Sequence, residues 1–246
     1  MRLQVKMKIL GQIGEMILNW ICPPTCPICH RETECAHTFC PECYARLVFI
    51  TRPCCTRCGL PFEYTPLDSP VCGACLQKKP AFDRARSVLI YDDFSKQPIL
   101  ALKHGDKTEL TPLFVRLLAQ ADPAIFHDID MIIPVPLHWT RRLKRTYNQA
   151  GLLAQGLGRI KQIPFEPCLL KRVRRTQSQG HLHHRQREKN VRGAFAVIRP
   201  KKIRGRRILV VDDVMTTGAT LSACARTLKR AGAREVRALT VYRVLK

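Results

Sequence analysis

The chain has 246 residues, of which 46% are hydrophobic and 25% are charged. This composition excludes an intrinsically disordered protein and allows one large domain or two smaller ones. The formal net charge of +23 is unevenly placed, because 20 Lys and Arg residues but only two acidic residues fall between Arg141 and Arg207. Such a focused positive field favours a polyanionic partner over a merely basic, solvated surface.

Residues 1–21 place apolar side chains at helical spacing, which predicts an amphipathic lead helix packed on the domain that follows. Lys8, Gly11 and Glu15 interrupt the apolar positions, so we expect neither a secretory signal nor, with fewer than 18 consecutive apolar residues anywhere, a transmembrane helix. Peripheral contact of this helix with a membrane surface is the alternative interpretation.

Eleven of the thirteen cysteines fall between residues 22 and 75, and eight of them form four C-x-x-C pairs. Two such knuckles complete a tetrahedral zinc site with four thiolate ligands, so four knuckles predict two sites. A disulfide framework is the alternative, but it needs an oxidising compartment that nothing in the sequence indicates. We therefore predict a double zinc ribbon over residues 22–80 that depends on metal to fold.

Sequential pairing assigns one zinc to the first two knuckles and one to the last two, although the sequence also allows an interleaved pairing. The predicted ligands of the first site are Cys26, Cys29, Cys40 and Cys43, and those of the second are Cys55, Cys58, Cys72 and Cys75. Cys22, Cys35 and Cys54 are predicted to be bystanders, although any of them could replace a neighbouring ligand. Cys168 and Cys224, which lie far from the ribbon, are predicted to be small core residues.

Residues 81–246 alternate apolar strands with helices, after a linker over residues 77–85. The predicted strands are 86–91, 130–136, 206–213 and 235–244, and the predicted helices are 96–105, 109–120, 148–160 and 219–232. Continuous apolar strands alternating with helices are typical of an α/β domain with a mostly parallel sheet flanked by helices.

The basic stretch over residues 171–189 contains few acidic or apolar residues. We interpret it as a groove that follows the backbone of a single strand of nucleic acid, with aromatic side chains available for base stacking; a solvated face is the alternative. The predicted DNA-binding residues are Arg141, Arg142, Arg145, Tyr147, Arg172, Arg174, Arg175, Arg185 and Arg187.

The stretch "VVDDVMTTGAT" over residues 210–220 ends a buried strand and starts a helix, where open parallel sheets place their ligands. Backbone N–H groups at such a helix start suit a phosphate, and Gly218 lets the backbone approach it closely. Two carboxylates beside a phosphate need another partner on the same ligand. Asp212 and Asp213 therefore predict a sugar diol, with Mg²⁺ nearby, and hence a ribose 5-phosphate.

The stretch "ILVVDDVMTTGATL" resembles the phosphoribosyl-pyrophosphate signature of type I phosphoribosyltransferases. Together with the cysteine pairs, "IIPVPLHWTRRLKRTYNQAGLLAQGL" and "LLKRVRRTQSQGHLHHRQREKNVRGAF" resemble the ComF/ComFC family of DNA-uptake competence proteins from about Cys26 to the C-terminus. The chain departs from the expected pattern at "RTYNQA", where a glycine-aromatic pair would give the loop more backbone freedom.

The resemblance implies a type I phosphoribosyltransferase-like domain over residues 81–246. It also implies that Asp212 and Asp213 bind the ribose hydroxyls of phosphoribosyl pyrophosphate, with Mg²⁺, and that the following turn binds its 5-phosphate. "LKHGD", with Lys103, corresponds to the pyrophosphate loop, and residues 141–149 correspond to a mobile loop. The implied phosphate-binding residues are Thr216, Thr217, Gly218, Ala219 and Thr220.

The resemblance further implies a cytoplasmic protein that handles incoming single-stranded DNA during natural transformation, at or near the inner face of the membrane. The zinc ribbon would dock a protein of the uptake or replication machinery. The alternative is an active phosphoribosyltransferase that transfers the pentosyl group to an acceptor which the sequence does not identify. No catalytic residue is assigned.

Overall fold

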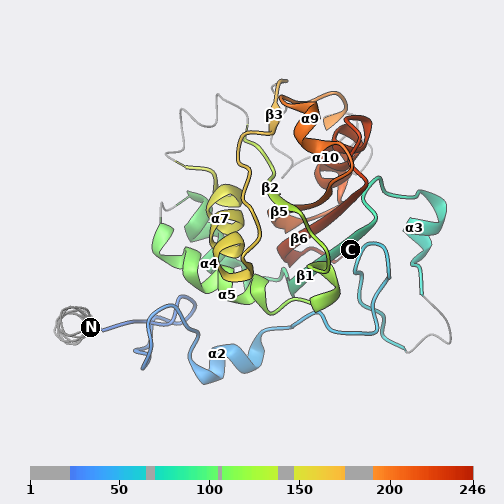
Figure 1. The fold of residues 1–246 in the computed structure, drawn as a ribbon. Helices are drawn as coiled ribbons and strands as arrows, with labels where there is room; N and C mark the ends of the chain where they lie inside the picture. Colours follow the sequence, from blue (N-terminus) through green and yellow to red (C-terminus); the bar gives the residue numbers. More distant parts are fainter. Residues whose placement is uncertain (1–22, 65–69, 105–106, 138–146, 175–190, 246) are drawn as a thin grey trace, which may run out of the picture. The chain divides into compact units, whose positions relative to one another are not determined.

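The computed structural model describes residues 23–64, 70–104, 107–137, 147–174 and 191–245 (Figure 1). The predicted lead helix over residues 1–21 lies outside these ranges. The chain divides into two compact units, Met1–Leu47 and Val48–Lys246. This division puts the first two cysteine knuckles in the first unit and the last two in the second, while the boundary predicted at residue 80 stays a prediction.

In the described part of the first unit, a short helix carries the second cysteine knuckle. Helix α2 spans Pro41–Arg46, with Pro41 in its first turn, where a missing N–H costs no helical hydrogen bond. The side chain of Cys40 caps this helix by accepting a hydrogen bond from the backbone N–H of Cys43. The sequence Cys-Pro-Glu-Cys thus places two sulfurs at the start of one helical turn.

The second unit is built on a parallel sheet. Its strands are β1 (Arg84–Ile90), β2 (Met131–Pro134), β5 (Arg207–Met215) and β6 (Glu235–Arg243), in the order β1-β6-β5-β2. Every neighbouring pair in this sheet is parallel (Figure 1). This arrangement confirms the predicted α/β class with a mostly parallel sheet, and all four predicted strands are present.

Helices cover both faces of the sheet (Figure 1). The helices α5 (Thr111–Ala119) and α7 (Gln149–Lys161) pack on each other, and α7 contacts β2 and β5. Helix α10 (Ala219–Arg230) packs on the other face, in a core cluster with Ile133, Val210 and Ala238. The alternate strand residues Ile132, Leu209 and Leu239 are fully buried but outside that cluster, as expected when successive side chains point to opposite faces.

Short segments lie along both edges of the sheet. The backbone N–H of Ile50 donates to Val88, and that of Ile90 donates to Val48, so residues 48–50 cover the outer edge of β1. At the other edge the N–H of Ile132 donates to Pro164, and its carbonyl accepts from Glu166. The remaining described elements are α3 (Gly73–Gln77), α4 (Lys96–His104), η1 (Thr108–Leu110), η2 (Pro123–Ile125) and α9 (Pro200–Ile203).

The sequence analysis did not predict the antiparallel pair of β3 (Leu170–Arg172) with β4 (Phe195–Val197). These strands bound the part of the basic stretch that lies outside the described residues. The prediction that Cys168 is a core residue is wrong, because it lies exposed in the turn before β3. Cys224 is fully buried in α10, as predicted. Within the described residues, no helix is both long and apolar enough to cross a membrane.

Candidate ligand site and cysteine centres

The candidate ligand site lies at the carboxyl end of β5. Asp212 and Asp213 belong to the last residues of this strand and are partly buried. Gly218 follows with a backbone φ of 73°, and α10 begins at the next residue. A Cβ atom on Gly218 would lie 2.8 Å from the Met215 methyl group, so both the left-handed backbone and the close packing require glycine.

The turn between β5 and α10 presents the hydrogen-bond donors that a phosphate needs. The first N–H groups of an α-helix have no intrahelical partner, and Gly218 has no side chain to cap them. The Ala219 N–H makes a long contact of 3.4 Å with the Thr217 hydroxyl. Because the helix dipole adds positive potential at this end, the turn over residues 216–220 can bind an anion.

Lys103 reaches the same site from the end of α4. Its Nζ lies 3.1 Å from Oδ2 of Asp213, and both side chains are largely buried. The start of α7 is tied to this end of α4, because the Tyr147 hydroxyl donates to the Leu102 carbonyl at 2.7 Å. The structure therefore brings together Lys103 and the two aspartates, which the sequence separates by more than a hundred positions.

The two aspartates differ in their electrostatics. Burial and the neighbouring Asp213 charge raise the pKa of Asp212 to about 8, against the lowering effects of the Asp213 N–H, Lys103 and Arg172. The Asp213 N–H donates to Oδ1 of Asp212 at 3.0 Å. One carboxylate is thus paired with a lysine while its neighbour holds a proton near neutral pH, a state that a bound cation would reverse.

Of the predicted DNA-binding residues, only Tyr147, Arg172 and Arg174 lie in the described part of the chain. Arg174 is exposed. Arg172, in β3, lies with its guanidinium 5.5 Å from the centroid of the Phe195 ring, and its charge acts on Asp212. Arg172 therefore lies near the ligand site. The predicted residues outside the description are Arg141, Arg142, Arg145, Arg175, Arg185 and Arg187.

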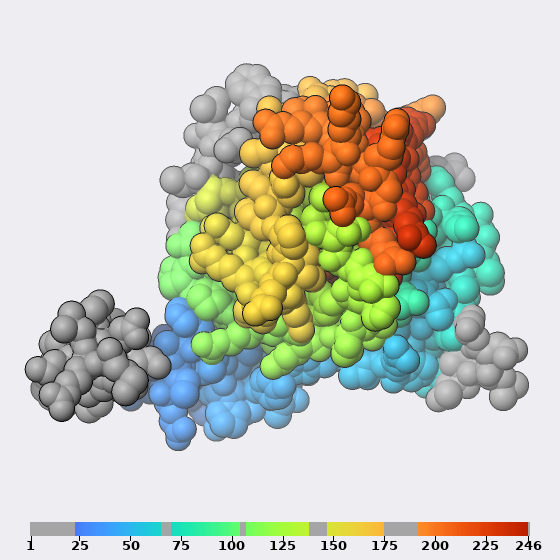
Figure 2. Space-filling model, in the orientation of Figure 1, coloured from blue at the N-terminus to red at the C-terminus, as the bar shows by residue number. Residues whose placement is uncertain are grey.

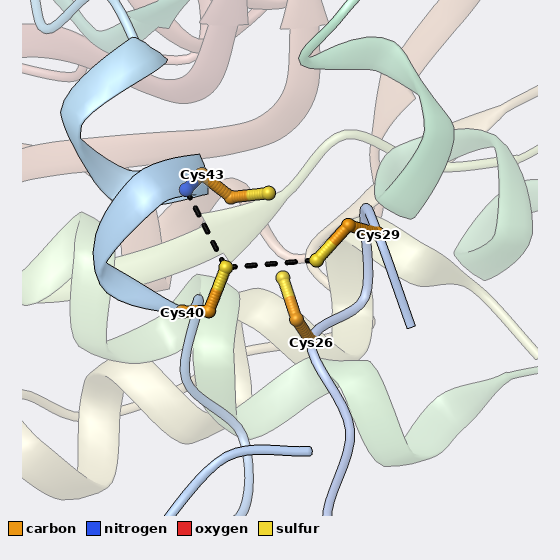
Figure 3. A group of neighbouring side chains, drawn as sticks. All are labelled: Cys26, Cys29, Cys40 and Cys43. Atoms are coloured by element: carbon orange, nitrogen blue, oxygen red, sulfur yellow. Dashed lines mark hydrogen bonds between the residues drawn. The ribbon is translucent and has the colours of Figure 1, made fainter. Parts of the chain in front are cut away.

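The first cysteine group gathers all four predicted ligands of the first zinc site (Figure 3). Their sulfur atoms lie within 4.8 Å of one another, and those of Cys29 and Cys40 are 3.6 Å apart. Four sulfurs at the usual zinc–sulfur distance would be about 3.8 Å apart in a tetrahedron. The group therefore fits a zinc ion, and the sequential pairing is the one that the structure adopts.

The second group consists of Cys55, Cys58, Cys72 and Cys75. Its sulfur atoms also lie within 4.8 Å of one another, and all four residues are buried. A hydrogen bond from Cys58 lowers the pKa of the Cys55 thiol to about 4, whereas burial raises the pKa of Cys75 to about 12. Without a cation, the four thiols cannot all ionise together. Zinc would supply that charge, and its binding would release protons.

A basic cleft on the second unit was missed by the sequence analysis. The cleft has a volume of about 490 Å³ and lies beside the amino end of β5. The ligand site lies at the other, carboxyl end of the same strand. The segment around residue 200, drawn in orange, lies at the surface in Figure 2. The cleft is lined by four basic residues, Lys201, Lys202, Arg204 and Arg206, and by one acidic residue, Glu166. The only feature of the sequence that could have predicted it is the density of basic residues between positions 201 and 206.

Comparison with known proteins agrees with this architecture. Residues 17–76 match the double zinc ribbon domain family, and residues 146–246 match the phosphoribosyl transferase domain family. A purine phosphoribosyltransferase from Pyrococcus horikoshii aligns at 17% identity with a TM-score of 0.35, over 55% of this chain and 85% of that one. The two family matches, together with the parallel sheet and the cysteine groups, define a zinc-ribbon protein with a phosphoribosyltransferase-type α/β domain.

Two relatives identify the family. The DNA utilization protein YhgH of Salmonella typhimurium is 33% identical over 229 residues, covering 91% of this chain and 98% of the relative. Competence protein F of Haemophilus influenzae is 33% identical over 190 residues, covering 75% of this chain and 82% of the relative. The chain belongs to the ComF/ComFC family of competence proteins.

Proposed function

We propose that this protein binds phosphoribosyl pyrophosphate with Mg²⁺ at the Asp212–Thr220 site and handles incoming single-stranded DNA in the cytoplasm during natural transformation. The observation that carries the ligand proposal is the meeting of three features at one strand end. They are the paired carboxylates of β5, the Gly218 turn at the start of α10, and Lys103 from α4. A ribose diol, a 5-phosphate and a pyrophosphate match these features in turn.

The DNA proposal rests on charge and on the family. One relative is named a DNA utilization protein and another a competence protein. The basic excess of this chain falls in its second unit. Among the described residues, exposed Arg174 and the cations of the basic cleft could contact backbone phosphates. The zinc ribbon, by the same proposal, docks a protein of the uptake or replication machinery.

The ligand proposal is tested by calorimetric titration of the zinc-loaded protein with phosphoribosyl pyrophosphate and Mg²⁺. Binding is expected for the native chain and is expected to be lost in Asp213→Ala, which removes both a diol acceptor and the partner of Lys103. Glu235→Ala is the matched control, because it removes a carboxylate at the opposite end of the sheet. No binding by the native chain at millimolar ligand would refute the proposal.

Turnover is the second candidate function, and the position of Lys103 favours it. The Lys103 ammonium, which lies beside the paired carboxylates, can stabilise the negative charge that develops as pyrophosphate leaves the anomeric carbon of the ribose. Release of pyrophosphate with and without single-stranded DNA distinguishes the two functions. Release that stops in Asp213→Ala supports the enzyme, whereas binding without release supports a ligand-gated DNA-handling module.

The DNA proposal is tested by affinity for a single-stranded oligonucleotide measured against salt concentration. If backbone phosphates are bound, the logarithm of the affinity falls linearly with the logarithm of salt, and removal of one phosphate contact lowers the slope by about 0.7 for a single strand. Arg174→Ala tests the exposed arginine, and Lys201→Ala with Arg204→Ala tests the basic cleft. A slope near zero in the native protein would contradict the proposal.

A further inference from the structure

The second cysteine centre is built into the same core as the candidate ligand site. Its four cysteines belong to one buried cluster with Phe82 and Met215. Met215 is the last residue of β5 and directly precedes the phosphate-binding turn. A zinc centre that served only as a separate docking module would not need side chains in this core.

Arg243 connects the cysteine centre to the strand that carries the aspartates. It ends β6, beside Met215 of β5, and is only 7% exposed. Its Nη1 donates to the Cys58 carbonyl at 2.5 Å and its Nη2 donates to the Cys58 sulfur at 3.4 Å. The same Nη1 lies 3.5 Å from the Met215 sulfur. One buried guanidinium thus contacts both a predicted zinc ligand and the residue before the turn.

Met215 also contacts the turn between β5 and α10. The methyl group of Met215 lies 2.8 Å from the position that a Cβ on Gly218 would occupy, and the Phe82 ring lies 3.6 Å from it. Nearby, the Ala81 N–H donates to the Ser222 hydroxyl in the first turn of α10 at 3.0 Å. Met215, Ala81 and Phe82 therefore pack against the turn and the first turn of α10.

The charge of the centre explains why an arginine is buried here. Four thiolates around one Zn²⁺ leave a net charge of about −2, which the protein must offset when the centre is enclosed. The Arg243 guanidinium supplies one positive charge and directs an N–H to a sulfur. When the metal leaves and thiols take up protons, the negative charge beside Arg243 decreases while its guanidinium stays buried. The Nε of Arg243 has no hydrogen-bond partner among the described residues.

We propose that Arg243 is a positioning residue that couples metal occupancy of the second cysteine centre to the affinity of the Asp212–Thr220 site for its sugar-phosphate ligand. This inference rests on the proposed function. By linkage, the metal tightens ligand binding by the same factor by which the ligand tightens metal binding, and such coupling typically amounts to about 5- to 150-fold. The first cysteine centre belongs to the other compact unit, and the proposal does not include it.

The experiment uses the full chain with Cys26→Ser and Cys29→Ser, so that, of the two cysteine groups in the described residues, only the second keeps all four thiols. Co²⁺ or Zn²⁺ affinity is measured by chelator competition with and without saturating phosphoribosyl pyrophosphate and Mg²⁺, with inorganic pyrophosphate as the control for chelation. The ligand is expected to tighten metal binding about 5- to 150-fold. It is also expected to shift the thiolate-to-cobalt charge-transfer band, a spectroscopic change that general stability does not produce.

Arg243→Lys keeps the positive charge but loses the forked contact. Metal affinity is expected to fall about 10- to 100-fold, as for other residues that support metal ligands, and both ligand responses are expected to vanish. Arg86→Lys is the matched control. Arg86 also donates to the knuckle, through the Cys55 and Thr56 carbonyls. It lies on β1, and within the described residues its other hydrogen bonds go to Asp122 and Ala85 rather than to Met215. Its variant should bind metal less tightly and keep both responses.

Full ligand responses in Arg243→Lys, or their equal loss in Arg86→Lys, would overturn the inference. If the ligand binds but leaves metal affinity and the cobalt spectrum unchanged, the coupling inference is wrong, whereas the proposed function still stands. If metal-loaded protein with Arg243 intact does not bind phosphoribosyl pyrophosphate, the proposed function is wrong and the inference falls with it.

Discussion

Asp212 and Asp213 are adjacent in sequence but occupy different electrostatic environments. Asp213 is paired with Lys103, whereas burial and the neighbouring charge keep Asp212 protonated up to a pH of about 8. A folded-state pKa above the ordinary value of 3.8 means that the native state binds the extra proton between these two pH values. The contribution of Asp212 to stability therefore falls as pH rises through this window.

This electrostatic difference gives a prediction for Asp212→Asn, which mimics the protonated side chain. The thermal midpoint of the variant should exceed that of the native protein by less near pH 5 than near pH 9, because the native protein loses the contribution of Asp212 progressively between pH 3.8 and about 8. Thermal unfolding of the ligand-free, zinc-loaded protein at both pH values measures the change. A constant difference between the two proteins across this range would show that Asp212 does not titrate in it.

A second prediction at this position concerns ligand binding. If Mg²⁺ and the sugar diol bind the ionised pair, binding at pH 7 must expel the proton held by Asp212, whose pKa is about 8. Calorimetry in buffers of different ionisation enthalpy is expected to show release of nearly one proton per ligand bound. Asp212→Glu, which keeps an ionisable carboxyl group at this position, is the control. Ligand binding by the native protein without proton release would contradict the assignment of the bound proton to Asp212.

Among the elements, α7 shows why a helix can carry several glycines. Glycine in a helix interior costs about 1 kcal/mol relative to alanine, yet the apolar spacing over residues 148–160 correctly predicted a helix there. The reason is contact with α5. A Cβ on Gly156 would lie 2.6 Å from one methyl carbon of Val115 and 3.1 Å from the other. The glycine therefore lets two helices approach closely.

Gly156→Ala should destabilise the protein by about 1–3 kcal/mol, because the added methyl overpacks the contact between α5 and α7. In a Val115→Ala background the same change should become neutral or stabilising, since only the helix-propensity gain remains. Denaturant unfolding of the two single variants and the double variant gives the coupling energy. Additive effects would show that the two residues do not crowd each other.

The elements also show how far the sequence could predict the structure. Continuous apolar runs predicted all four parallel strands, because burial on both faces leaves a local signal. The pair β3 and β4 left none: each strand has three residues, and their pairing joins Leu170 to Val197 across the basic stretch. The pairing of Lys103 with Asp213 is likewise non-local, since only the parallel order of the strands brings α4 beside the end of β5.

In the molecule as a whole, the two cysteine centres have different structural roles. The sequence predicted both groups correctly, because each knuckle is local, but it could not predict what they pack against. The second centre is part of the core that supports β1, β5 and β6, and Arg243 and Arg86 both donate to its first knuckle. The first centre lies in the other compact unit.

Removing the second centre should therefore unfold more of the protein than removing the first. Cys75→Ser is expected to lower the thermal midpoint of the second unit and to increase hydrogen exchange in β5 and β6. Cys29→Ser should increase exchange only within residues 23–47. Hydrogen exchange followed by mass spectrometry resolves the two patterns. Equal exchange of β5 and β6 in both variants would contradict the distinct roles.

The covered edges of the sheet affect how this protein can associate with others. Exposed edge strands invite a strand from another chain to add to the sheet, which gives oligomers or aggregates. Residues 48–50 and 164–166 already occupy hydrogen-bonding positions on β1 and β2. A partner that approaches these two edges of the four-stranded sheet must therefore recognise side chains and charge, and its binding should be sensitive to surface substitutions and to salt rather than to backbone pairing.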